Sequence, residues 1–134
     1  MFVTEYKVTV RDINYGGHMG NEVPLLLFQQ VRIDFLKSYS LSEVDIGDGI
    51  GTIQRESHVK YNREVFLGDK LKISIDKIEI EKLSLKFYYT VYNELEVNVV
   101  EGATLMLAYN YKLKKVSKVP ESFRKIIEKI SEKN

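Results

Sequence analysis

The stretch that decides the fold is Val10–Tyr39, which reads VRDINYGGHMGNEVPLLLFQQVRIDFLKSY. Its first third is a loop rich in glycine and polar residues, and the remainder is apolar at helical spacing. Pro24 suits the first turn of a helix, where a missing N–H costs little, and Asn21 is predicted to be the N-cap. We therefore predict a strand, a glycine-rich loop and then a long helix over Glu22–Tyr39.

The loop concentrates residue types that can take part in chemistry or shape a tight backbone: Asp12, Asn14, Tyr15, Gly16, Gly17, His18, Gly20 and Asn21. Glycine and asparagine allow turns that leave backbone N–H groups pointing outward. A loop that leads into a helix N-terminus presents unpaired N–H donors at the positive end of the helix dipole, which suits an oxyanion or an anionic ligand. An ordinary strand-to-helix turn would use the same residues, so both readings stay open.

The predicted helix is apolar over most of its circumference. A helix on a protein surface carries an apolar stripe about 100° wide, so this wider coverage predicts a helix wrapped by other structure. Polar members such as Arg32 then need partners if they are buried. Gln30 and Asp34 are four residues apart and share a helical face.

The rest of the chain reads as strands followed by one more helix. The segment Lys70–Ile75 alternates, and its phase then slips to Ile78 and Ile80, which predicts a bulge or a strong bend. A helical pattern returns after Pro120. The other alternating segments are Phe2–Val10, Ile53–Tyr61, Leu83–Val91 and Val97–Leu113. The pattern predicts a single α+β domain over residues 1–134, in which one curved antiparallel sheet of about five strands wraps one helix.

Composition narrows the class of protein. The chain has 134 residues, 44% hydrophobic and 29% charged, as in ordinary soluble domains. Its 20 basic and 19 acidic residues give a net charge of +1, so neither nucleic acid nor a membrane is expected as a partner. With no cysteine and two histidines, it offers no thiol nucleophile and no recognisable metal-ligand set. No signal-peptide pattern or membrane-spanning run is present, so a cytoplasmic protein is expected.

These segments resemble the hot-dog fold, and more narrowly the 4-hydroxybenzoyl-CoA thioesterase-like acyl-CoA thioesterases. Those proteins carry a D-x-D-x-x-G-H-x-N-N pattern after the first strand, where this chain reads DINYGGHMGN over Asp12–Asn21. Their helix contains a Glu-Ala-Arg-like triplet, which corresponds to Gln30-Val31-Arg32. The family's Y-x-x-P and G-D-x-L segments are similar to Tyr61–Glu64 and Gly68–Leu71. The likeness covers Val3 to about Leu113.

The resemblance implies hydrolysis of an acyl-CoA thioester to a carboxylic acid and free coenzyme A. It implies no cofactor beyond the coenzyme A of the substrate, and a homodimer or tetramer with sites at the interface between protomers. Asn14 stands where many members have a catalytic aspartate, and Gln30 replaces the glutamate of the triplet. An amide cannot accept a proton at neutral pH, although it can orient a water molecule.

Two other functions stay open for such a domain. The amides at positions 14 and 30 are compatible with a non-catalytic protein that binds acyl-CoA or a fatty-acyl group. A hot-dog dehydratase acting on a 3-hydroxyacyl thioester would need a histidine paired with a carboxylate. His18 and Asp12 permit such a pair.

Four residues are predicted to serve the chemistry: Asn14, His18, Asn21 and Asp12. Backbone N–H groups over Gly20–Glu22 would polarise the thioester carbonyl. Asn14 would position water, and His18 would act as general base, alone or with Asp12, because an ordinary histidine changes protonation near neutral pH. The structural alternative is that His18 bonds across the loop and Asp12 caps it.

Four residues are predicted to contact the coenzyme A part of the substrate: Gly17, Gly20, Glu22 and Arg63. The glycines allow close approach to the backbone, and Arg63 could meet a phosphate group. In the structural alternative, Glu22 only complements the helix dipole and Arg63 is an ordinary solvated charge.

Overall fold

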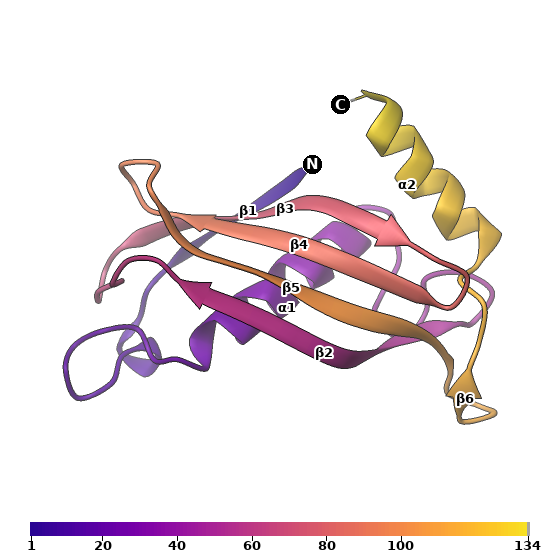
Figure 1. Ribbon diagram of the computed structural model, residues 1–134, viewed down its shortest axis with the longest axis horizontal. Coiled ribbons are helices and arrows are strands. Elements are labelled where there is room, and N and C mark those ends of the chain that lie inside the picture. The colour runs from indigo at the N-terminus through magenta and orange to yellow at the C-terminus, as the bar shows by residue number, and fades with distance from the viewer. Residues whose placement is uncertain (134) are drawn as a thin grey trace.

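The structure, a computed structural model, describes residues 1–133. Its sheet curves across one long helix, as Figure 1 shows. Along the chain the elements are β1 (Phe2–Lys7), the 3-10 helix η1 (Val10–Asp12), α1 (Val23–Lys37), β2 (Gly51–Tyr61), β3 (Lys70–Ile80), β4 (Ser84–Tyr92), β5 (Asn98–Asn110), β6 (Lys115–Val116) and α2 (Glu121–Lys133). The antiparallel strand order is β1-β3-β4-β5-β2, and β6 pairs with the end of β5.

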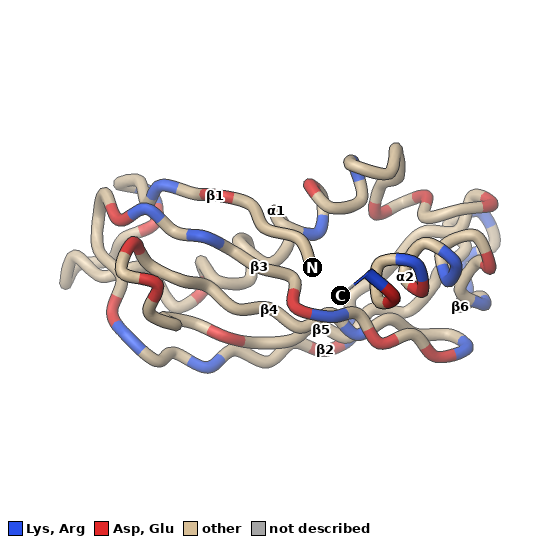
Figure 2. The backbone as a smooth tube through the Cα atoms, turned by 90° about the horizontal axis from the view of Figure 1, so that it is seen from above, with Lys and Arg blue, Asp and Glu red and all other residues tan. Residues whose placement is uncertain are grey.

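This arrangement confirms the predicted α+β hot-dog architecture. In the view of Figure 2, α1 lies on one side of the sheet, and Lys, Arg, Asp and Glu residues of both signs are interspersed along the backbone. The described sheet has six strands instead of about five, because the two-residue β6 adds to its edge. No helix within residues 1–133 is long and apolar enough to cross a membrane.

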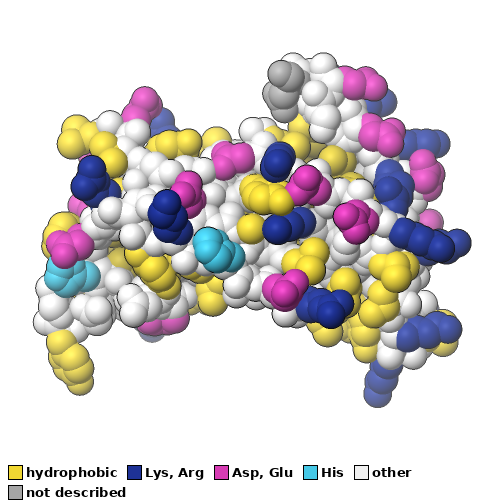
Figure 3. Space-filling view, in the orientation of Figure 1, with side chains coloured by type: hydrophobic (Ala, Val, Ile, Leu, Met, Phe, Trp, Pro, Cys, Tyr) yellow, Lys and Arg dark blue, Asp and Glu magenta, His cyan; other side chains and the backbone are white. Residues whose placement is uncertain are grey.

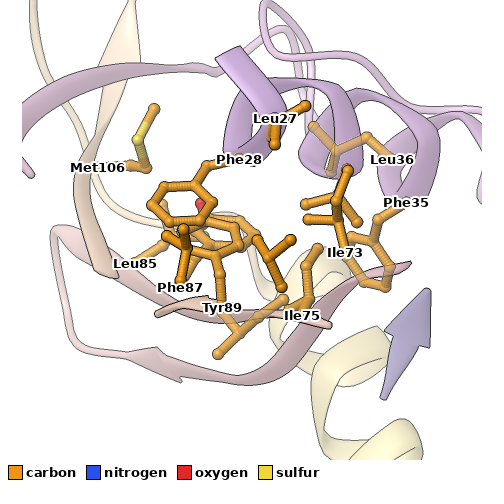
Figure 4. Packing of buried hydrophobic residues seen from close by; sticks show 14 of the residues in the cluster. Leu27, Phe28, Phe35, Leu36, Ile73, Ile75, Leu85, Phe87, Tyr89 and Met106 are labelled. Atoms are coloured by element: carbon orange, nitrogen blue, oxygen red, sulfur yellow. The ribbon is translucent and has the colours of Figure 1, made fainter. Parts of the chain in front are cut away.

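The core lies between α1 and the sheet. Figure 4 shows side chains of α1 packed over inward-facing side chains of β3, β4 and β5: Leu27, Phe28, Phe35 and Leu36 over Ile73, Ile75, Leu85, Phe87, Tyr89 and Met106. The side of α1 that faces away from the sheet is open, since Leu26 is 60% exposed and Ile33 is 41% exposed. The expectation of a helix wrapped by other structure therefore holds on the sheet side of α1 and not on its opposite side.

Three predicted boundaries differ from those in the structure. β1 ends at Lys7 instead of Val10, because the chain turns into η1 there. α1 ends at Lys37 instead of Tyr39, since Ser40 takes a left-handed φ of 58°. β5 ends at Asn110 instead of Leu113. The Oδ1 atom of Asn110 accepts hydrogen bonds from the N–H groups of Lys112 and Leu113 and so closes a turn.

The start of α1 also differs from the prediction. The helix begins at Val23, and Pro24 lies in its first turn as expected. Its N-cap residue is Glu22, and the side chain of this residue makes no capping hydrogen bond. Asn21 is therefore not the N-cap, because it lies one residue too early in the chain. The predicted bulge in the third strand is confirmed, since the register between β3 and β4 shifts between Ile75 and Lys77.

One charged side chain lies inside the core. Arg32 of α1 is 4% exposed, and its Nε atom donates to the Glu43 carboxylate at 2.7 Å. Its Nη1 atom donates to the Tyr89 hydroxyl at 3.0 Å, and that hydroxyl lies 2.6 Å from the Thr104 hydroxyl. Burial alone would lower the pKa of Arg32, but its interactions with Tyr89 and Glu43 raise that pKa overall. The charged guanidinium thus ties α1 to β4, to β5 and to the loop after the helix.

Candidate functional site

The loop before α1 is closed by its own backbone. The Asn14 N–H donates to the His18 carbonyl at 2.8 Å, and the Gly17 N–H donates to the Asn14 carbonyl at 3.0 Å. The Asn14 side-chain oxygen accepts from the Gly16 N–H at 3.0 Å. Gly17 has φ 77°, a left-handed conformation that favours glycine. These contacts give the Asn14 amide and the Gly17 backbone defined roles in the turn.

A second segment, the connection between β2 and β3, holds His18 in place. The Met19 N–H donates to the Val65 carbonyl at 2.7 Å, and His18 forms an isolated β-bridge with Phe66. The two rings lie with their centroids 5.2 Å apart. The Nδ1 atom of His18 lies 3.4 Å from a carboxylate oxygen of Glu64. The imidazole therefore has a carboxylate beside one of its two nitrogens.

Gly16 leaves the room that this imidazole occupies. A Cβ atom at position 16 would lie 2.8 Å from the Cδ2 atom of His18 and 3.4 Å from its Nε2 atom. A side chain at that position would therefore require the ring to move. No protein group within residues 1–133 forms a hydrogen bond with the Nε2 atom, so this nitrogen can meet a substrate or water.

The start of α1 offers fewer N–H donors than the sequence suggested. The Gly20 N–H donates to the Asp12 carbonyl at 2.7 Å, and the Val23 N–H donates to the Gly20 carbonyl at 3.1 Å. Neither group can bind a ligand. In the described part of the chain the N–H groups of Asn21 and Glu22 have no protein acceptor, and the Tyr61 hydroxyl from β2 donates to the Asn21 carbonyl. The predicted donor cluster over Gly20–Glu22 thus narrows to two residues.

Gly20 has a steric role instead. A Cβ atom added at Gly20 would lie 2.6 Å from one carboxylate oxygen of Glu22 and 2.8 Å from the other. The Glu22 carboxylate therefore folds back over Gly20, at the positive end of the helix dipole. This places a negative charge beside the two available N–H groups.

Asp12 is engaged away from His18. It is 8% exposed, and its Oδ2 atom accepts hydrogen bonds from the Tyr6 hydroxyl at 2.6 Å and from the Thr9 N–H at 2.7 Å. The hydrogen bond to Asp12 raises the pKa of Tyr6. The carboxylate therefore fastens η1 to β1. The carboxylate beside His18 belongs to Glu64 instead. Glu64 is not among the predicted site residues, although it ends the Tyr61–Glu64 segment that resembles the family's Y-x-x-P.

Arg63 lies next to the residues that hold His18. Its N–H donates to the Val99 carbonyl at 3.1 Å, and its exposed side chain lines a surface hollow of about 500 Å³. Glu64 and Phe66 line the same hollow, together with Asn62, Asn93 and Val97. The structure thus brings Arg63, Glu64, Phe66 and His18 into one region beside the loop.

Comparison with known proteins identifies the family. The profile of the thioesterase-like superfamily matches residues 8–127, which is most of the chain. The protein belongs to this superfamily. The match includes the whole loop, α1 and the connection that carries Glu64. No curated protein sequence gives a significant match.

Solved structures resemble this superfamily member over nearly its whole length. A hypothetical protein from Staphylococcus aureus in complex with CoA has a TM-score of 0.85 at 23% identity, covering 95% of this chain and 81% of the other. A 1,4-dihydroxy-2-naphthoyl-CoA thioesterase from Synechocystis has a TM-score of 0.83 at 17% identity, covering 94% of each chain. A predicted thioesterase from Bacillus stearothermophilus has a TM-score of 0.82 at 18% identity, covering 96% of this chain and 94% of the other. At these identities the likeness establishes the shared fold.

Proposed function

We propose that this protein hydrolyses acyl-CoA thioesters to a carboxylic acid and free coenzyme A. The observation that carries the proposal is that the Glu64 carboxylate lies beside the Nδ1 atom of His18. The loop that carries His18 leads directly to the N–H groups of Asn21 and Glu22, which are free within residues 1–133. Membership of the thioesterase-like superfamily supports it. The CoA complex of the S. aureus protein and the activity of the Synechocystis enzyme are compatible with a CoA thioester as substrate.

In the proposed reaction, water attacks the carbonyl carbon of the thioester while the Nε2 atom of His18 accepts the proton from water. The N–H groups of Asn21 and Glu22 hold the oxyanion that develops on the carbonyl oxygen. When the tetrahedral intermediate collapses, the C–S bond breaks and the proton passes from His18 to the sulfur. Asn14 would orient the attacking water through its amide, which cannot itself act as the base.

The remaining predicted contacts concern coenzyme A. Arg63 would pair with a phosphate group, because a guanidinium forms bidentate hydrogen bonds with phosphate oxygens. Gly17 would let the substrate approach the backbone closely, whereas the Glu22 carboxylate covers Gly20. Glu22 would contribute its N–H group rather than its carboxylate. The Gly20 N–H itself is occupied by Asp12 and supplies no donor.

We also expect the protein to work as a pair of identical chains. β2 is the last strand in the sheet order, is 11 residues long, and exposes most of its side chains. The side of α1 that faces away from the sheet exposes the apolar residues Leu26 and Ile33. An uncovered strand edge and exposed apolar surface each favour pairing with another copy. Sedimentation equilibrium should give a mass of two chains or a multiple of it, whereas a monomer at every concentration would contradict this assembly.

The direct test is thiol release from a panel of acetyl-, butanoyl-, octanoyl-, palmitoyl- and benzoyl-CoA. We expect saturable turnover of at least one member. Saturable binding without turnover would instead identify an acyl-CoA-binding protein, as the amides at Asn14 and Gln30 allow. Conversion of a 3-hydroxyacyl-CoA to its enoyl form, with no thiol released, would identify a dehydratase that uses His18 with Glu64.

A further inference from the structure

A stack of aromatic rings fills the space between α1 and the sheet. Phe28 of α1 is fully buried and lies parallel to Tyr89 of β4, with ring centroids 4.2 Å apart and an interplanar angle of 6°. Phe87 lies nearly parallel to Tyr89 at 6.3 Å. Figure 4 shows the three rings together beneath α1. The Tyr89 hydroxyl is fixed by Arg32 and Thr104, so the middle ring of the stack cannot turn aside easily.

Phe28 also lies directly against the backbone of β5. A Cβ atom added at Gly102 would come within 2.8 Å of the Cε2 atom of Phe28 and within 2.2 Å of the His58 carbonyl oxygen. Glycine at this position is therefore what lets the ring reach the sheet. No space for another side chain or an alkyl chain separates the helix from β5 at this point.

The Phe28 ring lies next to the proposed site. Tyr61 of β2 donates to the Asn21 carbonyl at the start of α1. Val59 is two residues before Tyr61 and therefore lies on the same face of β2. Its register partner on β5 is Gly102, which Phe28 covers. With the thioester carbonyl at the N–H groups of Asn21 and Glu22, an acyl chain that extends inward between α1 and the sheet thus meets Phe28.

The hollow on the other face of the sheet cannot replace this space. A surface depression of about 530 Å³ lies over Ala103, Leu105 and Tyr88. The side chains of these three residues alternate along the strands with Gly102, Thr104 and Tyr89, which face α1, although Gly102 and Tyr89 also border the depression. Ala103, Leu105 and Tyr88 therefore lie on the face of the sheet that is turned away from α1, and Figure 3 shows this face. The sheet itself separates it from the helix start.

We propose that Phe28 ends the acyl-binding space and limits the protein to short acyl groups. This inference rests on the proposed function for the position of the thioester at the start of α1. A longer chain would have to displace Phe28 and break its contact with Tyr89. Removing the ring should open room in the core that extra methylene groups can fill.

The test measures kcat/KM for straight-chain acyl-CoA substrates with the wild type and with Phe28→Ala. We expect the wild-type value to fall from butanoyl- to octanoyl- to palmitoyl-CoA. Each methylene group buried in the opened space should raise kcat/KM by roughly a factor of four. The octanoyl-to-butanoyl ratio of Phe28→Ala should therefore rise by about tenfold or more. Phe28→Leu, which leaves a smaller opening, should give an intermediate ratio and serves if the alanine variant does not fold.

Phe87→Ala is the matched control, because it removes an equally large buried ring. Phe87 is two residues before Tyr89 on β4 and pairs with Thr104 rather than with Gly102. This variant should change the thermal stability to a similar extent and leave the chain-length ratio unchanged. Calorimetry with non-hydrolysable thioether analogues of the same chain lengths measures how binding affinity depends on chain length in the absence of turnover. Analogue affinity that follows the expected pattern without thiol release would support the role of Phe28 and overturn the proposed hydrolysis. Equal wild-type rates for palmitoyl- and butanoyl-CoA, or an unchanged ratio in folded Phe28→Ala and Phe28→Leu, would overturn the role of Phe28.

Discussion

Replacing His18 with alanine is expected to lower kcat/KM for the best acyl-CoA substrate by a factor of ~10² or more. His18 is the side chain on the loop that combines a nitrogen beside a carboxylate with a second nitrogen available to a ligand. Without it, neither of the other two predicted loop residues can readily replace the base, since Asn14 is an amide and the Asp12 carboxylate is bound to Tyr6 and Thr9. The loss should fall on kcat, because KM depends mainly on contacts to coenzyme A. Thiol release under saturating and limiting substrate separates the two constants.

Two further variants make this result specific. Glu64→Gln keeps the shape of the side chain but removes the charge beside the Nδ1 atom, so it should lower kcat less than His18→Ala and leave KM unchanged. His58→Ala removes the other histidine, an exposed residue of β2, and should retain wild-type kcat. Full activity in His18→Ala, with His18→Ala folded, would mean that the base lies elsewhere. Glu22 would then be the next carboxylate to replace, because it lies beside the N–H groups of the helix start.

The sequence predicted the site's segments better than it predicted their contacts. Periodicity and glycine positions were enough to locate the loop, the helix and the bulge in β3, because these features depend on neighbours in the chain. The partner of His18 could not be found in this way, since Glu64 is brought to it by the connection between β2 and β3. The available N–H groups also depended on a longer-range contact, the hydrogen bond from Gly20 to the Asp12 carbonyl. The first contact is set by how the connection between β2 and β3 lies against the loop, and the second by how the loop closes on itself.

The polar residues of the helix illustrate the same limit. The sequence indicated that these side chains would need hydrogen-bond partners if buried. In the structure, one of them bonds to a neighbour on the same helix, and another bonds to residues far along the chain. The Gln30 amide donates to Asp34 four residues later at 2.9 Å, as helical spacing suggests. Arg32 instead meets Glu43, Tyr89 and Thr104, two of which lie on strands far along the chain. Spacing along a helix identifies the first kind of pair and cannot identify the second.

Replacing Arg32 with methionine is expected to lower the free energy of unfolding by about 3 kcal/mol, the lower end of the range for breaking a buried ion pair. Methionine keeps much of the side-chain volume, so the loss reports the charge and its hydrogen bonds more than a cavity. The effect is placed at the lower end because Glu43 is 22% exposed and water can partly solvate its carboxylate after the change. Urea unfolding followed by circular dichroism measures the difference.

The double variant Arg32→Met with Glu43→Gln tests whether the loss comes from the pair. Most of the cost of removing one partner is the uncompensated charge of the other, so neutralising Glu43 as well should restore part of the stability. Arg55→Met, at an exposed position of β2, should change the free energy of unfolding by less than about 0.5 kcal/mol. A loss below about 1 kcal/mol in Arg32→Met would show that the guanidinium is not needed to hold Tyr89. In that case Tyr89 and Phe28 would keep their stacked positions through packing alone, and Arg32→Met would leave the acyl-chain preference of the wild type unchanged.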